Sequence, residues 1–362
     1  MSTDTSLPTL EVGSQPPVLP LRTKLLFWLI LGTLSVELAE VVSSSDPFPF
    51  FHLWGLIVTF PVYALHVLVL AYFVFGRKKA TLPSLFLAGA ILGMYEAYLT
   101  KVLWNPTWGE SFTLQAGGVY VIQTAVLVLF WHPLLAFVLP VFFAENLFTS
   151  SSETFDALPR FAQKALRKRP VFFLAVVAFA VFGGIYQSGA LRTLRLSLLS
   201  GASATAALFL LGGLWRWVRR GRSLSLRDVL PSKRQAAVLG AFLLVMYIVM
   251  GALLRRDALP RTLTPHLTVG GMYAILIVLL YFNLKHSSPW TGTGPSAIRD
   301  ISVQTGLVLG GVFTLTSALF GLVGGNVKMV VVFGSWVVGC ALGAALLIEG
   351  VVNAFRPGRR HG

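Results

Sequence analysis

Residues 50–79 have the sequence FFHLWGLIVTFPVYALHVLVLAYFVFGRKK. No Asp, Glu, Lys or Arg occurs from Phe50 to Phe75, and Arg77, Lys78 and Lys79 follow directly. A helix needs about 20 mostly apolar residues to cross a bilayer. Basic residues gather in the cytoplasmic loops of membrane proteins. This stretch therefore predicts a membrane-spanning helix that ends at a cytoplasmic loop.

The same pattern recurs along the chain and predicts an all-α, polytopic integral membrane protein with about ten transmembrane helices. The fourth expected span contains His132-Pro133 and Pro140, so we expect a kink or a break there. The ten spans are Lys24–Val42, Phe50–Phe75, Leu82–Trp104, Gly118–Phe143, Val171–Ser188, Leu196–Val218, Ala236–Leu254, Leu267–Leu284, Ile301–Gly324 and Met329–Phe355.

The composition agrees with this class. Of the 362 residues, 55% are hydrophobic and 12% are charged, and the mean hydropathy is +0.75. A soluble domain carries about 25% charged residues. The net charge of +15 comes from short basic clusters between apolar runs, which favours contact with anionic lipid over nucleic acid. The single cysteine, Cys340, excludes an intramolecular disulfide and Cys-cluster metal sites.

The distribution of Lys and Arg predicts the orientation. With the N-terminus inside, the inner segments hold 22 of these residues and the outer loops hold 6. This bias predicts that both termini are cytoplasmic, in a prokaryotic inner membrane. The chain then divides into a polar N-tail (1–22), four spans with polar stripes (23–149), an interfacial helix (150–169), six mostly apolar scaffold spans (170–355) and a basic C-tail (356–362).

The segment 150–169 is too polar to cross a membrane. Ser150 and Glu153 have the spacing of a capping box. Apolar residues recur beyond them at helical spacing, opposite Arg160, Lys164 and Arg167. We expect a short amphipathic helix whose basic residues bind the anionic inner leaflet. An ordinary solvated linker is the alternative.

Acidic residues inside the spans are the main candidates for function, because each costs several kcal/mol in a bilayer. Glu37 and Glu40 share one stripe of the first span. Glu96 in the third span shares a face with Gly89 and Gly93, which allow close approach of another helix. At about 1.5 Å per residue, all three glutamates lie on the outer side of the midplane.

Further polar residues of the first four spans predict one outward-opening cavity. We expect acid–base or coupling roles for Glu37, Glu40, Glu96 and His52, with Lys101 either snorkelling or pairing with a glutamate of the first span. Glutamates with His52 can also bind a metal, but no HxxE or ExxH pair supports this, and we predict neither metal nor cofactor. The alternative is that these groups only fix helix packing. The expected substrate contacts are Tyr63, His66, Tyr98, Gln123 and His132.

Signatures of soluble catalysis are absent, since the chain has no GxxxxGK[ST], HExxH or GxSxG. The first hypothesis is a transporter coupled to protons or cations through the glutamates. The second is an integral membrane enzyme that acts at the outer leaflet on a lipid or lipid-linked substrate. The third is a non-catalytic subunit of a membrane complex. The sequence leaves the substrate and the oligomeric state open.

Overall fold

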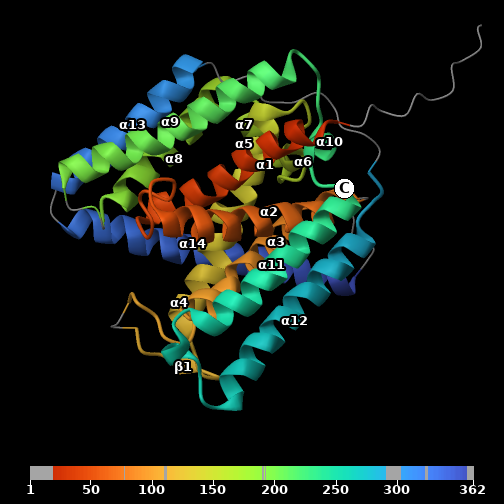
Figure 1. Ribbon diagram of the computed structural model, residues 1–362, viewed down its shortest axis with the longest axis vertical. Helices are drawn as coiled ribbons and strands as arrows, with labels where there is room; N and C mark the ends of the chain where they lie inside the picture. Colours follow the sequence, from red (N-terminus) through yellow and green to blue (C-terminus); the bar gives the residue numbers. More distant parts are fainter. Residues whose placement is uncertain are drawn as a thin grey trace, which may run out of the picture.

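The computed structural model describes residues 19–76, 78–109, 112–189, 191, 193–290, 303–322 and 325–356. Most of the expected N-tail, nearly all of the C-tail, Arg77 and the ends of the ninth span lie outside these ranges. Among the described residues, nine helices are long and apolar enough to cross a membrane. The chain is an all-α, polytopic membrane protein (Figure 1).

The first expected span is a continuous helix that is not among these nine. It consists of α1 (Leu21–Val36) and the π-helical segment η1 (Glu37–Val41). Its 21 residues, at about 1.5 Å each, are long enough for a bilayer core of about 30 Å. The expected number of about ten is reached when this helix is counted.

The remaining spans match the predicted ranges to within a few residues at most ends. They are η2–α2 (Gly55–Phe75), α3–η3 (Leu82–Thr100), α4–η4–α5 (Val121–Phe148), α8 (Arg169–Gln187), α9 (Leu194–Arg219), α11 (Lys233–Leu253), α12 (Leu263–His286), α13 (Val303–Leu322) and α14 (Gly325–Phe355). A two-stranded hairpin, β1 (Gln115–Ala116) and β2 (Val119–Tyr120), precedes α4.

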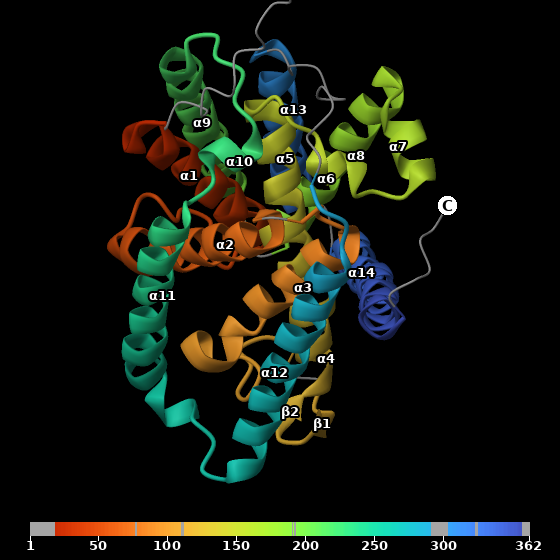
Figure 2. The ribbon, with the colours of Figure 1, turned by 90° about the vertical axis from the view of Figure 1, so that its right-hand side faces the viewer.

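The helices form two peripheral groups around a central one (Figures 1 and 2). Helix α13 packs against α8 and α9 on one side. On the other side, α11 packs on α2, and α12 packs on α3 and α14. The centre holds α1, α2, α3, the η4 segment (Val126–Val138) and α14. The polar residues of the first four spans therefore lie inside the molecule.

Glycines make the central contacts close, as their spacing predicts. A Cβ atom on Gly89 would lie 2.5 Å from the Cα of Pro133, and one on Gly93 would lie 2.7 Å from the carbonyl oxygen of Leu127. The Gly339 and Gly343 pair of α14 packs against the other face of the same segment, on Phe130 and the backbone of Leu129. Only glycine fits at these crossings.

The fourth span does not break at its prolines. Residues 121–148 form one continuous helix, and the stretch Val126–Val138 around Pro133 is π-helical. The wider hydrogen-bonding pattern accommodates the missing N–H of the proline, so the chain continues as one helix without a break.

One end of the bundle, which we call the basic end, is tied together by Arg227. Its guanidinium binds the Glu153 carboxylate through Nε at 2.7 Å and Nη2 at 2.6 Å. It also donates to the carbonyl oxygens of Gly76 and Lys78 and lies 4.3 Å from the centre of the Trp290 ring. Loops that are far apart in sequence are thereby held at one end.

The segment 150–169 differs from the single helix expected. It forms two short helices, α6 (Glu153–Asp156) and α7 (Arg160–Leu166), separated at Pro159. The capping box does not form, because the carboxylate of Glu145 accepts the backbone N–H groups of Glu153 and Thr154 instead. The basic residues Arg160, Lys164 and Arg167 are nevertheless exposed, as predicted.

Candidate functional site

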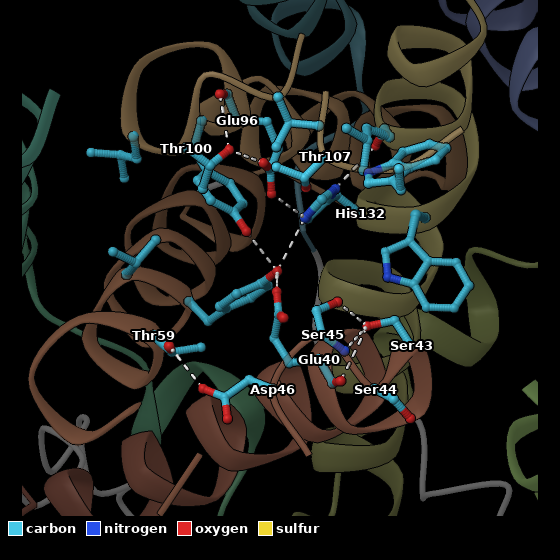
Figure 3. Close-up of a pocket in the computed structure, with 18 of the residues that line it drawn as sticks. Glu40, Ser43, Ser44, Ser45, Asp46, Thr59, Glu96, Thr100, Thr107 and His132 are labelled. Atoms are coloured by element: carbon cyan, nitrogen blue, oxygen red, sulfur yellow. Dashed lines mark hydrogen bonds and ion pairs between the residues drawn. The ribbon is translucent and has the colours of Figure 1, made fainter. Parts of the chain in front are cut away.

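A cavity of about 1040 Å³ lies at the end opposite the basic end, among the first four spans, α11 and α14. Its lining combines acidic, hydroxyl, histidine and aromatic side chains (Figure 3). In Figure 3, Glu40 and Glu96 reach toward the same region from different helices, with His132 beside them. Three predicted residues on three separate spans are therefore brought together, and the predicted residues His52 and Tyr63 also line the cavity.

Four π-helical segments surround this cavity. They are η1, η2 (Gly55–Thr59), η3 (Glu96–Thr100) and η4, and each contributes lining residues. Well under 1% of residues in globular proteins are π-helical. Such segments occur frequently at functional sites. All π-helical segments in the described part of the chain converge here, which marks the cavity as the candidate site.

Three of the four described non-glycine residues with φ in the left-handed region lie at the same place. Ser44, Lys101 and Arg255 have φ values of 60°, 64° and 43°, in the left-handed region that non-glycine residues rarely occupy. Ser44 and Arg255 line the cavity, and Lys101 follows the lining residue Thr100. Residues in such conformations cluster at functional sites.

Tyr63 is the hub of the polar network at the base of the cavity. Its hydroxyl donates to the Glu40 carboxylate. The Tyr95 hydroxyl lies 2.7 Å from that of Tyr63, and Nε2 of His132 lies 3.1 Å from it. Because the single proton of Tyr63 points to Glu40, Tyr95 is the donor to Tyr63.

A proton count shows what is unusual about His132. Its Nδ1 lies 3.2 Å from the carbonyl oxygen of Leu127, so Nδ1 carries the proton and Nε2 of the neutral ring is an acceptor. Nε2 lies 3.6 Å from Oε1 of Glu96, whose other oxygen accepts from Thr100. When Glu96 is ionised, two acceptors therefore face each other. One added proton between His132 and Glu96 would turn this contact into a charge-assisted hydrogen bond.

The rim of the cavity is built from charged side chains. Asp46 accepts from His52 at 2.8 Å and from Thr59 at 3.0 Å, and so joins the loop after η1 to η2. Arg255 donates to the carbonyl oxygens of Thr100 at 2.9 Å and Asn105 at 2.7 Å. The lining contains three carboxyl groups, Glu40, Asp46 and Glu96, and one arginine, so its formal charge is negative when the carboxyl groups are ionised and the histidines are neutral.

Aromatic rings form much of the remaining wall. Trp108 lies 5.3 Å from Trp336 between ring centres, and the Trp336 indole donates to the Tyr186 hydroxyl at 2.8 Å. The aromatic lining residues are Trp54, Tyr63, Tyr95, Trp108, Phe112, Trp131, Tyr186, Phe333 and Trp336.

Five predicted substrate or coupling residues lie outside the cavity lining. His66 is one layer behind it, with its ring 5.7 Å from that of Tyr95 and its Nε2 2.9 Å from the Tyr247 hydroxyl. Gln123 supports the loop at the rim by donating to the carbonyl oxygens of Trp108 and Gly109. Tyr98 points away and is 41% exposed.

The fourth of these residues, Lys101, neither snorkels nor meets a glutamate. Its side chain is fully buried, and its ammonium group donates to the carbonyl oxygens of Tyr98 and, at 2.7 Å, Gly251. The α3–η3 helix ends at this residue in a left-handed conformation, which turns the side chain toward α11. Lys101 therefore fixes the end of the helix to α11.

Glu37 faces a second cavity, of about 700 Å³, on the other side of η1. Its side chain is 6% exposed, and its Oε1 has no hydrogen-bond partner. The predicted stripe of Glu37 and Glu40 is thus divided between two cavities. Within the described residues, no group of three His, Cys, Asp or Glu side chains is placed to hold a metal ion.

Sequence reasoning missed several residues of the site. Tyr95 directly precedes Glu96, and Arg255 belongs to a cluster of arginines in a loop predicted to be outside, where few are expected. These were available signals. Asp46 lies in a polar loop and had no distinguishing pattern.

Comparison with known proteins agrees with the architecture. A family model described as an uncharacterized membrane protein family matches residues 29–356. The chain belongs to this membrane protein family. One relative is a protein from Archaeoglobus fulgidus that is described as an uncharacterized protein. It is 39% identical over 276 residues, which are 75% of this chain and 81% of the relative. No solved structure matches the chain.

Proposed function

We propose that this protein is a proton-coupled transporter of organic cations. The observation that supports it is the contact between His132 and Glu96, which lacks a proton when Glu96 is ionised, at the base of a cavity lined by carboxylates and aromatic rings. A buried pair of acceptors binds a proton readily, and the cavity beside it favours positive charge.

The lining matches the chemistry of an organic cation. Tryptophan and tyrosine faces attract cations by about 0.5–2 kcal/mol each, and more when water is excluded. The carboxylates Glu40, Asp46 and Glu96 attract a cation directly. Two N–H groups of Arg255 donate to backbone carbonyl oxygens. An anionic substrate would face net repulsion from the same groups.

Coupling follows from competition between two positive charges. A cation beside Glu40 and Glu96 disfavours a proton between Glu96 and His132, so binding of one favours release of the other. Tyr63 links Glu40 to His132, the neighbour of Glu96, because its hydroxyl can donate either to Glu40 or to Nε2 of His132. The proposed exchange is one organic cation against protons.

The positive-inside bias supports an orientation with the basic end in the cytoplasm of a prokaryotic cell. In that orientation the cavity faces the outside. The exposed basic residues of α7, Arg160, Lys164 and Arg167, then contact the anionic inner leaflet.

The test is proton movement in liposomes that contain the purified protein and an internal pH-sensitive dye. Addition of ethidium or tetraethylammonium outside should drive proton efflux through the wild type. Glu96→Gln should lower this flux at least tenfold, and Asp257→Asn, an exposed carboxylate at the same end, should leave it unchanged. Wild-type proton flux from a folded Glu96→Gln protein would refute the assignment of the coupling site.

One observation favours a second candidate, a membrane enzyme acting on a lipid-linked substrate at the outer leaflet. Glu40 and Glu96 approach the cavity from separate helices beside His132, as an acid and a base would. This candidate predicts turnover in detergent without a membrane gradient. The transporter predicts no chemical change in the cation that crosses the liposome membrane.

A further inference from the structure

The second cavity is an apolar groove with a cationic end. Its wall is formed by α1, α5 (Leu139–Phe148), α8, α9 and α13. Leu, Val, Phe, Ala and Gly side chains make up most of this wall, and the arginines Arg216 and Arg219 lie at the end where α9 terminates. This is the basic end of the bundle, because α9 leads directly into the loop that carries Arg227.

The groove has the dimensions of one lipid chain. The part of α9 that lines it runs from Ala204 to Arg219, which is about 22 Å at 1.5 Å per residue. Half the hydrocarbon core of a bilayer is about 15 Å thick. A volume of about 700 Å³ holds roughly twenty groups of water size, at about 30 Å³ each. This suits one acyl chain and is too small for a whole two-chain lipid.

Small residues keep the groove open. A Cβ atom on Gly213 would meet no other atom within 4 Å, and one on Gly212 would meet only the Phe148 ring, at 3.3 Å. The wall of the groove next to these glycines is held in place by Trp215. This buried residue packs on Phe27, and its indole donates to the carbonyl oxygen of Phe148. The space beside these glycines is therefore bounded by fixed walls.

We propose that this groove binds an anionic phospholipid of the leaflet at the basic end, with one acyl chain in the groove and the phosphate at Arg216 and Arg219. Charge complementarity selects this occupant, since an arginine fork matches a phosphate and each cation near an anionic head group contributes about fivefold in affinity. A zwitterionic lipid such as phosphatidylcholine carries the same phosphate, but its choline cation is repelled by the two arginines. The site is independent of the transport cavity, from which η1 separates it.

The experiment uses the full-length protein in phosphatidylcholine liposomes that contain phosphatidylglycerol with a photoreactive diazirine on one acyl chain. After irradiation, cross-linked peptides are located by mass spectrometry. The expected adducts fall on α9 and α13, around Phe209 and Phe313, which line the groove. The same diazirine on phosphatidylcholine should label these positions at least fivefold less.

Two independent variants test the two halves of the site. Arg216→Gln with Arg219→Gln should reduce phosphatidylglycerol labelling roughly 10- to 25-fold, and Arg222→Gln, beyond the groove, should not. Gly213→Leu should displace the chain from the groove, whereas Gly240→Leu on α11, also in open space, should leave labelling unchanged. Each variant is first checked for folding by gel filtration.

Equal labelling by the two lipids in the wild type would overturn the proposal without any variant, because it would mean unspecific contact with surrounding lipid. Labelling confined to outward-facing residues, or labelling unaffected by the double arginine variant, would overturn it as well. None of these outcomes depends on transport activity.

Discussion

Tyr63 gives the sharpest test of the site, because one hydroxyl joins three other groups. Tyr63→Phe keeps the ring and its packing against Tyr95, whose centre is 5.6 Å away, and removes only the oxygen. The variant loses the donation to Glu40, the hydrogen bond from Tyr95 and the contact with His132. The side chain is 1% exposed, so its partners have little access to water other than that in the cavity.

The magnitude follows from those contacts. A hydrogen bond to a charged group contributes about 1.5–3 kcal/mol and one between neutral groups about 1 kcal/mol. Tyr63→Phe should therefore lower the free energy of unfolding by about 2.5–4 kcal/mol. If the bond to Glu40 forms during the rate-limiting step of transport, its loss slows the coupled proton flux by about 10- to 150-fold.

The assay combines unfolding in detergent with the liposome flux measurement. Tyr72→Phe is the matched control, since it lies on the same helix and does not line the cavity. A double-mutant cycle of Tyr63→Phe with Glu40→Gln should give a coupling energy above about 1 kcal/mol. Additivity of the two variants within about 0.5 kcal/mol would refute the network as described.

Three further predictions address packing, the second cavity and the basic end. Gly93→Ala should destabilise by about 1–3 kcal/mol, because its Cβ would lie 2.7 Å from the Leu127 carbonyl oxygen, while Gly240→Ala should be neutral or stabilising by up to about 1 kcal/mol in the same thermal unfolding assay. Glu37→Leu should raise the free energy of unfolding by about 1–3 kcal/mol, since it removes a buried carboxyl oxygen without a partner, and a decrease would show that this oxygen is paired in the membrane. Arg227→Ala should cost about 3 kcal/mol and expose the 149–168 segment to limited proteolysis, whereas Lys233→Ala should leave the digestion pattern unchanged.

Hydropathy was sufficient to locate the membrane-spanning helices in the sequence, because each of them has to be apolar along its whole length. The Gly89 and Gly93 pair of the third span could also be recognised from the sequence, since only the absence of a side chain allows the observed approach to η4. The sequence does not in general predict which membrane-spanning helices pack against each other. Arg255 reaches Asn105 across 150 positions of sequence, and no local pattern encodes such a contact.

The candidate site was predicted in part for a related reason. Helical spacing placed Glu40, Glu96 and Tyr63 on faces expected to line one cavity, because ionisable groups avoid lipid, and the structure brings these side chains together. It failed for Lys101, where the α3–η3 helix ends in a left-handed residue and redirects the side chain. Helical spacing predicts the direction of a side chain only for residues within a regular helix.

Glu37 and Glu40 line different cavities although α-helical spacing predicts a shared face, and the π-helical geometry of η1 explains the difference. In an α-helix, residues three apart differ by about 60° around the axis and share a face. Glu37 and Glu40 instead belong to η1, whose wider turn rotates them farther apart, and they line different cavities. The same widening at η3 and η4 sets the positions of Glu96 and His132 across the cavity from Glu40. A regular helix at η1 would return both glutamates to one face, so the separation of the two cavities depends on a backbone feature that residue spacing does not reveal.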